Sequence, residues 1–230
     1  MLFRSQEYRR ALVLHPNLDE VHHELGLIYA HIGLWDEALL QIQKEVAINP
    51  TNIVTSLRRG QVLIYQGKCE EALAVLQKIP RDINPSLVGY NLAWAFFCLG
   101  RKKEASATLA EFLSSAPEDT GGVFAAMQAV LAAAAGDARQ AEDKIKSALE
   151  RGKGFGHFHH TAYSIASAYA LLNKPEPAIQ WLRTASETGF PCYPLFERDP
   201  NLNHLRKDPR FVAFLAKLKE QWASYKAAFS

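Results

Sequence analysis

Histidines gather at one point of this sequence and raise the question of a metal site. His157, His159 and His160 lie close together, and Cys192 is a further candidate ligand. Two ligands on one helix share a face when they are three or four residues apart. Only His157 and His160 have that spacing, and the sequence implies neither a third ligand nor a partner acid. We therefore predict no metal site and no cofactor, and we interpret the run as a helix start with surface histidines.

A glycine-rich run at residues 152–156 raises the question of a phosphate-binding loop. It follows an expected helix instead of a strand and has no Gly-Lys-Ser/Thr step, so the dinucleotide-binding and P-loop contexts are both missing. We interpret it as a linker. The cations at 101–103 lie at an expected helix end, and the acidic pairs lie at expected helix starts. The helix dipole favours charges of these signs at those ends. No Ser-His-Asp or Cys-His arrangement can be found, so we predict no catalytic residues and no enzyme activity.

Composition narrows the class of partner. The chain has 230 residues, 48% of them apolar, and 26 Lys plus Arg against 24 Asp plus Glu give a formal charge of +2. A near-neutral chain lacks the basic footprint of a nucleic-acid or anionic-membrane binder, so we predict neither partner. The start has no signal-peptide pattern, and the most apolar stretch, 123–135, is short and interrupted by Gln128. We expect no membrane span.

The cysteines suggest a reducing compartment. Cys69, Cys98 and Cys192 are odd in number and have unrelated spacings. That pattern indicates neither a disulfide framework nor a Cys-X-X-Cys zinc or redox site. We therefore expect free thiols and a cytoplasmic location.

The prolines and apolar residues predict helices throughout. Eleven prolines separate blocks in which apolar residues recur at three- and four-residue intervals. In one block two short amphipathic helices meet at Gly33, which suits a left-handed residue at a helix end. No stretch alternates apolar and polar residues long enough to indicate a sheet. The predicted class is all-α.

Small residues recur with a period that indicates a solenoid. Gly26, Gly33 and Ala38 recur 34 residues later as Gly60, Gly67 and Ala72. Small side chains are needed where helices cross closely, so the series marks helix crossings. It continues at somewhat varied intervals through Ala93, Gly100 and Ala105, then Ala129, Gly136 and Ala141, then Ala166, Asn173 and Ala178.

These positions resemble the tetratricopeptide repeat. Its pattern is partly met in the first copy by His22, Leu25-Gly26, Tyr29, Ala38, Ile42 and Pro50. The resemblance implies a right-handed superhelical solenoid of antiparallel helix pairs over residues 1–188. It comprises a half repeat at 1–16 and five helix pairs at 19–50, 53–80, 85–117, 120–151 and 157–188. Residues 189–230 are expected to form a loop and capping helices, the last of them a lid over the final hairpin.

The two ends of the sequence suggest alternatives for the function of the protein and for its organisation. Residues 178–214 are similar to the ends of tetratricopeptide arrays attached to bacterial serine/threonine kinases, adenylate-cyclase-like proteins and transcriptional regulators, which implies a regulatory domain as an alternative function. The half repeat suggests either a fragment of a longer protein or a natural cap, and we favour the fragment because a cap should have a polar outer face. Its apolar residues, Leu2, Phe3, Tyr8, Leu12 and Leu14, would lose a neighbouring helix, so we predict a weak homodimer through residues 1–16.

The family resemblance also implies a binding surface. In such arrays the first helix of each hairpin lines a concave groove, so we predict a non-enzymatic scaffold that binds a protein or peptide there. The matching face offers Arg58 and Asn91 but no lysine, which argues against a carboxylate clamp. The alternative is that the aromatic residues merely pack the inner wall. The predicted groove residues are Arg58, Gln61, Tyr65, Tyr90, Asn91, Trp94, Met127, His160 and Tyr163.

Overall fold

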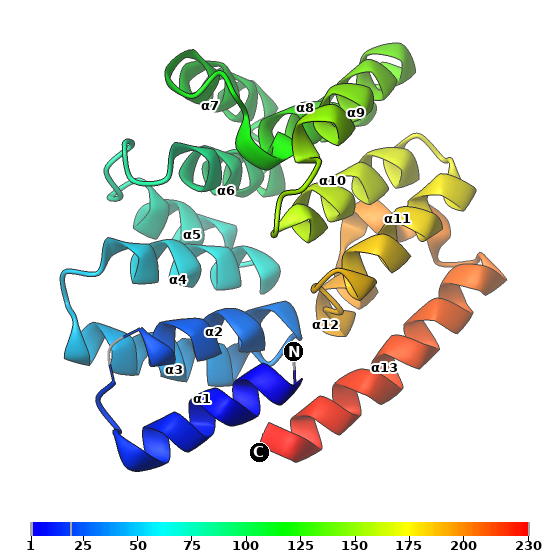
Figure 1. Cartoon of the computed structure of the whole chain (residues 1–230). Helices are drawn as coiled ribbons and strands as arrows, with labels where there is room; N and C mark the ends of the chain where they lie inside the picture. Colours follow the sequence, from blue (N-terminus) through cyan, green and yellow to red (C-terminus); the bar gives the residue numbers. More distant parts are fainter. Residues whose placement is uncertain (1, 19, 230) are drawn as a thin grey trace.

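Helices joined by short loops make up the computed structural model, which describes residues 2–18 and 20–229 (Figure 1). Helix α1 (Leu2–Leu14) comes first, and five antiparallel pairs follow. The pairs are α2 (Val21–His31) with α3 (Trp35–Ile48), α4 (Ile53–Tyr65) with α5 (Cys69–Leu76), α6 (Pro85–Cys98) with α7 (Lys102–Ser115), α8 (Val123–Ala134) with α9 (Ala138–Gly152), and α10 (Phe158–Leu171) with α11 (Pro175–Glu187). A short helix, η1 (Thr120–Gly122), leads into α8.

The first helix of every pair ends in the same way. Gly33, Gly67, Gly100, Gly136 and Asn173 all have a positive φ, between 54° and 80°. In each case the next residue donates its backbone N–H to a carbonyl five residues earlier, as Lys68 does to Leu63 at 2.8 Å. This is the Schellman ending, in which glycine avoids the strain that a Cβ would cause. The predicted left-handed residue is confirmed at Gly33 and recurs in all five pairs.

Small residues lie where the paired helices touch. A Cβ on Gly60 would come within 2.5 Å of Leu76 Cδ2, and one on Gly26 within 3.2 Å of Ile42 Cγ1. Their counterparts on the second helices have no exposed surface: Ala38, Ala72, Ala105, Ala141 and Ala178. These small residues therefore mark helix crossings, as the sequence predicts. For the middle members of the series the prediction is wrong: Gly67, Gly100 and Gly136 have nothing within 4 Å of a Cβ and serve the left-handed helix ends instead.

The pairs stack in an arc that curves until its two ends approach one another (Figure 1). The first helices of the pairs lie on the inner side, and those far apart in sequence meet there. Tyr90 of α6 shares a 2.9 Å hydrogen bond with Ser164 of α10, and the rings of Trp94 and Tyr163 stack with centroids 5.7 Å apart. The inner side is therefore much narrower than an open groove.

The C-terminal segment fills part of the inner side and closes the arc. It contains α12 (Tyr193–Arg198), η2 (Pro200–Leu205) and α13 (Pro209–Phe229). Phe190 is completely buried, and its ring lies within 5.7 Å of the rings of Tyr65, His160 and Tyr163. The open concave groove expected from the sequence is thus largely occupied by the chain's own residues.

Helix α13 reaches beyond the last hairpin, which corrects the expected lid. It contacts α11, and its C-terminal end lies beside α1 (Figure 1). Trp222 Nε1 donates to the Gly33 carbonyl at 3.1 Å, and Arg9 donates to the Ala228 carbonyl at 3.1 Å. The Tyr29 and Phe229 rings are 5.3 Å apart. Helix α13 therefore links the fifth pair to the first, which sequence periodicity could not show.

The expectation of free thiols at residues 69 and 98 is wrong. Cys69 at the start of α5 and Cys98 at the end of α6 form a disulfide, with Cα atoms 6.2 Å apart. Cys192 is free and buried. Helices α5 and α6 are consecutive and antiparallel, so the start of one lies beside the end of the other. Across the described residues, no helix is both long and apolar enough to cross a membrane.

We expect two glycines with similar backbones to respond differently to alanine. Gly122 has a φ of 69° and Gly136 a φ of 80°, but a Cβ on Gly122 would overlap the Ala148 backbone carbonyl, whereas one on Gly136 has nothing within 4 Å. Gly136→Ala should lower the free energy of unfolding by about 1–2 kcal/mol through left-handed backbone strain alone. Gly122→Ala should cost at least about 1 kcal/mol more because of overpacking. Urea unfolding measures both, and equal losses would contradict the close approach.

Candidate functional site

A pocket of about 280 Å³ remains on the inner side. Helices α4, α6 and α10 form its floor, and α12 with the residues that follow it forms one wall. The residues lining it are Ile64, Tyr65, Gly67, Tyr90, Asn91, Trp94, Phe97, Cys98, Lys102, His160, Tyr163, Leu195, Arg198, Asp199, Pro200 and Asn201.

Aromatic rings make the floor of the pocket rigid. Trp94 packs edge-on against Phe97 at 5.7 Å and stacks on Tyr163, which in turn stacks on Phe196 at 5.8 Å. Tyr90 also donates to the His160 backbone carbonyl at 3.3 Å. Rings fixed on three helices offer apolar contact area without losing further side-chain entropy on binding.

The polar groups of the floor and wall are held by hydrogen bonds within the protein. Tyr163 donates to Asp199 Oδ2 at 2.7 Å, and the Asn201 backbone N–H donates to Asp199 Oδ1 at 2.9 Å. Burial raises the pKa of Asp199, while these hydrogen bonds act in the opposite direction. Burial, together with the Asp199 charge, raises the pKa of Tyr163. Asn91 donates to the Leu87 carbonyl at 2.8 Å. These groups hold the fold and orient the pocket walls.

Two cations stand at the rim. Lys102 and Arg198 are exposed and line the pocket. Arg198 is held by a 3.0 Å hydrogen bond to the Pro194 carbonyl and lies 4.3 Å above the Trp35 ring, while Lys102 donates to the Ala134 carbonyl at 3.1 Å. The rim is therefore positive around an apolar interior.

The nine predicted groove residues divide into two groups. Six line the pocket: Tyr65, Tyr90, Asn91, Trp94, His160 and Tyr163. The other three do not. Met127 has no exposed surface and packs in the core, while Arg58 is buried and donates to the buried Gln61 at 3.2 Å. These three were expected on an open groove, but the narrow inner side buries them.

Sequence reasoning missed the wall and rim residues. Leu195, Arg198, Asp199 and Asn201 come from the C-terminal segment, outside the repeats, and Lys102 begins a second helix. The repeat pattern assigns inner positions only to first helices, so it had no signal for these residues.

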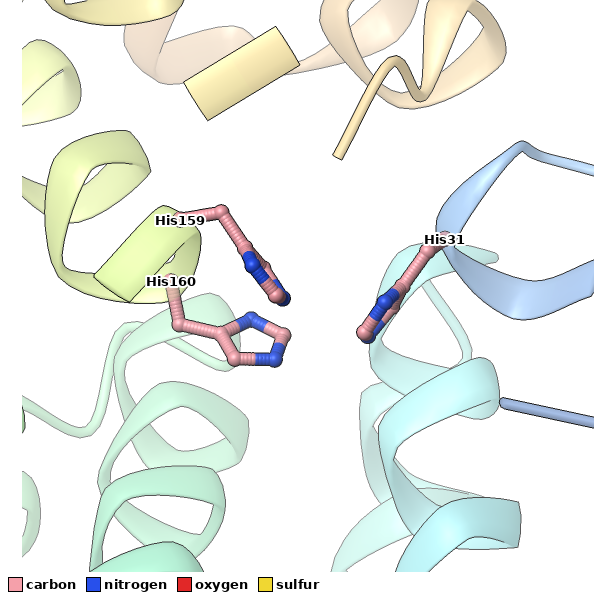
Figure 2. A group of neighbouring side chains, drawn as sticks. All are labelled: His31, His159 and His160. Atoms are coloured by element: carbon pink, nitrogen blue, oxygen red, sulfur yellow. The ribbon is translucent and has the colours of Figure 1, made fainter. Parts of the chain in front are cut away.

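The histidines are arranged differently from the prediction (Figure 2). His159 and His160 at the start of α10 are 4% and 2% exposed, so their assignment as surface histidines is wrong. His31 from the end of α2 joins them, and one ring nitrogen from each of the three lies within 4.8 Å of the others. His157 and Cys192 are not in this group. The third histidine that the sequence did not imply comes from the first repeat.

Burial keeps these imidazoles neutral. It lowers the pKa of His159 to about 4, with a further decrease from His157 and Arg58 and a small opposing effect of the Thr188 backbone. Burial, with the neighbouring histidines and Arg58, lowers the pKa values of His31 and His160 well below the ordinary value. Neutral rings present a free electron pair, which is the form that binds metals.

Known structures support the fold. No protein-family model matches the chain, and no curated protein matches it by sequence. PilW, a widely conserved type IV pilus biogenesis factor, superposes with a TM-score of 0.56 at 17% identity, over 88% of this chain and 92% of PilW. YrrB, a TPR protein with an unusual peptide-binding site, gives a TM-score of 0.47 at 15% identity, over 94% of this chain and 99% of YrrB.

The helix pairs and the likeness to PilW together define the class of fold. The chain is an all-α array of helix pairs with the fold of tetratricopeptide-repeat proteins, as the sequence predicts. At this level of identity the likeness concerns the fold alone.

Reduction of the Cys69–Cys98 disulfide, whose Cys98 lines the pocket, should destabilise the protein. A cross-link over 29 residues typically contributes about 2–4 kcal/mol. Urea unfolding with and without a phosphine reductant measures the loss, and a Cys69→Ser, Cys98→Ser double variant serves as the insensitive control. Alkylation of the denatured, unreduced chain should modify one thiol; modification of three would show that the disulfide is absent.

Proposed function

We propose that this chain is a non-enzymatic interaction module that binds an apolar side chain of a partner protein in the inner pocket. The observation that carries the proposal is the pocket itself, in which aromatic rings from α6 and α10 form a rigid floor that reaches the surface. Tyrosine and tryptophan side chains in desolvated pockets are the residues that most often contribute large binding energies.

The size of the pocket favours one or two apolar side chains of the partner, which we call the anchor, over a long peptide. At about 280 Å³ it lies just below the range of about 300–1,000 Å³ for ligand sites. The C-terminal segment, with Phe190 fully buried, occupies the inner surface beside it. We propose that one or two apolar side chains enter the pocket while the rest of the partner lies across the rim.

The rim favours a negatively charged neighbour of that anchor. Lys102 and Arg198 are exposed there, and Asp199, the acid that lines the pocket, is buried and hydrogen-bonded to Tyr163. A partner residue with a carboxylate next to the apolar anchor would pair with these cations and associate faster. The proposed ligand is therefore an apolar or aromatic residue flanked by an acidic one.

The polar groups of the pocket support binding instead of catalysis. Tyr163, Asp199 and Asn91 each hold a structural hydrogen bond. A general acid or base must have its proton or electron pair directed at a substrate. A regulatory domain of a larger kinase, cyclase or transcription regulator remains the alternative, in which the partner surface belongs to the same polypeptide.

We also propose a cellular compartment for this protein. The sequence predicts a cytoplasmic, bacterial protein. Disulfides persist mainly in oxidising compartments, so the Cys69–Cys98 bond favours a location outside the reducing cytoplasm.

A pocket-filling variant tests the proposed site. Ile64 is half-buried at the pocket, so Ile64→Trp should fill it, whereas Val212→Trp adds the same ring at an exposed position on α13 outside it. Peptides selected from a random display library on the wild type should contain an apolar residue beside an acidic one. Fluorescence polarisation should show at least about tenfold weaker binding to Ile64→Trp, or about 1.4 kcal/mol.

Val212→Trp should bind the selected peptides within about twofold of the wild type, and circular dichroism should show equal helicity for all three proteins. Failure to select any peptide, or equal binding to Ile64→Trp, would contradict the proposal.

We also propose weak self-association through residues 1–16. Of the residues predicted for this surface, Leu14 is 76% exposed, whereas Tyr8 and Leu12 are partly buried against the core; the neighbouring Val13 is 82% exposed. Leu2 and Phe3, which the sequence also assigned to this surface, have side chains outside the described residues. Light scattering should show a mass that rises with concentration for the wild type and for Val212→Glu, but not for Val13→Glu. A wild type that is monomeric at every concentration would rule out the dimer.

A further inference from the structure

We propose that His31, His159 and His160 form a buried binding site for one divalent transition-metal ion with a preference for imidazole, represented by Zn²⁺. The proposal does not depend on partner binding, and its test requires no partner. Figure 2 shows the three rings turned toward a common space between α2 and α10.

The geometry is close to that of a three-histidine site. One nitrogen from each ring lies within 4.8 Å of the others. Zinc–nitrogen bonds of about 2.0–2.1 Å place two ligand atoms roughly 3.4 Å apart in a tetrahedron. Ring rotations that bring the nitrogens together by about 1 Å complete the arrangement, and the fourth position is left for water or another ligand.

Unsatisfied nitrogens mark the site as incomplete without a ligand. His31 Nε2 and both ring nitrogens of His159 lack a partner at good hydrogen-bond geometry, although the Thr188 backbone lies close enough to His159 to act on its pKa. His31 is 2% exposed and His159 is 4% exposed, so water does not reach these atoms freely. A buried polar atom without a partner costs about 1–3 kcal/mol. A metal ion would satisfy one nitrogen of His31 and one of His159.

His160 is already oriented by its surroundings. Gln61 Nε2 and Tyr65 Oη lie 3.4 Å from its two ring nitrogens, and Arg58 donates to Gln61 Oε1. The Arg58 bond fixes the direction of the Gln61 amide. The Gln61 amide nitrogen can only donate, so it occupies the electron pair of His160 Nε2, and a metal ion at that nitrogen would replace this contact. Tyr65 Oη can accept from Nδ1–H, and metal-binding histidines characteristically hold a second hydrogen bond of this kind, which fixes the ring.

Charge and ligand type narrow the choice of ion. Neutral imidazoles select zinc, copper or nickel over calcium and magnesium, which prefer oxygen. The His157 ring lies 5.5 Å and 6.4 Å from the rings of His159 and His160, and Arg58 is linked to His160 through Gln61. The Arg58 charge opposes a cation. The nearby Glu24 carboxylate acts in the opposite direction on Arg58 and His157. We therefore expect weaker binding than in thiolate zinc sites.

The position of the site gives a metal ion a structural consequence. His31 belongs to the first helix pair and His159 and His160 to the fifth, so the ion would join the two ends of the arc. His160 also lines the pocket. An ion that binds only the folded chain raises its stability by mass action. Zinc should therefore stabilise the closed arrangement.

The test uses the full chain without a polyhistidine tag, stripped with a chelator and then dialysed against ZnCl₂. Elemental analysis should show one zinc per chain, and thermal unfolding should shift upward with zinc. Co²⁺ in place of zinc should give the visible absorption of a tetrahedral centre. His31→Gln and His159→Gln should each weaken zinc binding by at least about 100-fold, beyond the effect typical of an indirect partner.

His204→Gln, a change at an exposed histidine on η2, is the matched control and should bind like the wild type. Circular dichroism establishes that each variant is folded. Less than one zinc per wild-type chain, or unchanged binding by a folded His159→Gln variant, would overturn the proposal. A thermal shift with sodium phosphate but not with zinc would show an anion site beside Arg58 and would overturn it as well.

Discussion

Close packing between the two helices of each pair is the constraint on which the rest of the molecule depends. Gly60 against Leu76 shows the principle, since any Cβ there would collide with a buried side chain. A left-handed residue such as Gly67 then reverses the chain within a single turn. Repeated five times, this short distance between helices sets the positions of the inner helices, and through them the shape of the inner side.

The array curves so far that its inner side, which could have formed an open groove, becomes part of the protein interior. Tyr90 and Trp94 reach across to Ser164 and Tyr163, and the C-terminal segment places Phe190 among them. Burial of these rings stabilises the closed form, since aromatic side chains contribute large apolar areas. On the inner side, within the described residues, an aromatic pocket with a positive rim stays open, and this is the site proposed for partner binding.

The same closure explains the unusual electrostatics of the interior. His31, His159 and His160 come from opposite ends of the arc and are withdrawn from water together with Arg58. Desolvation then favours neutral imidazoles, which lowers their pKa values. Buried nitrogens without partners are costly, and nothing in the packing of the repeats themselves requires them. This combination is what separates the cluster from ordinary core histidines.

The sequence by itself determined the helices, because these depend on short-range spacing, and its resemblance to the tetratricopeptide repeat implied their pairing and the inner faces. It therefore located Tyr90, Trp94 and Tyr163 on the pocket side. Only the tertiary structure decided that the arc closes, that Arg198 and Asp199 complete the pocket, that Cys69 meets Cys98, and that His31 joins His159. The disulfide depends on how the consecutive helices α5 and α6 pack, and the other contacts depend on the accumulated curvature of five pairs and on the path of the C-terminal segment. No local pattern of residues encodes such distances.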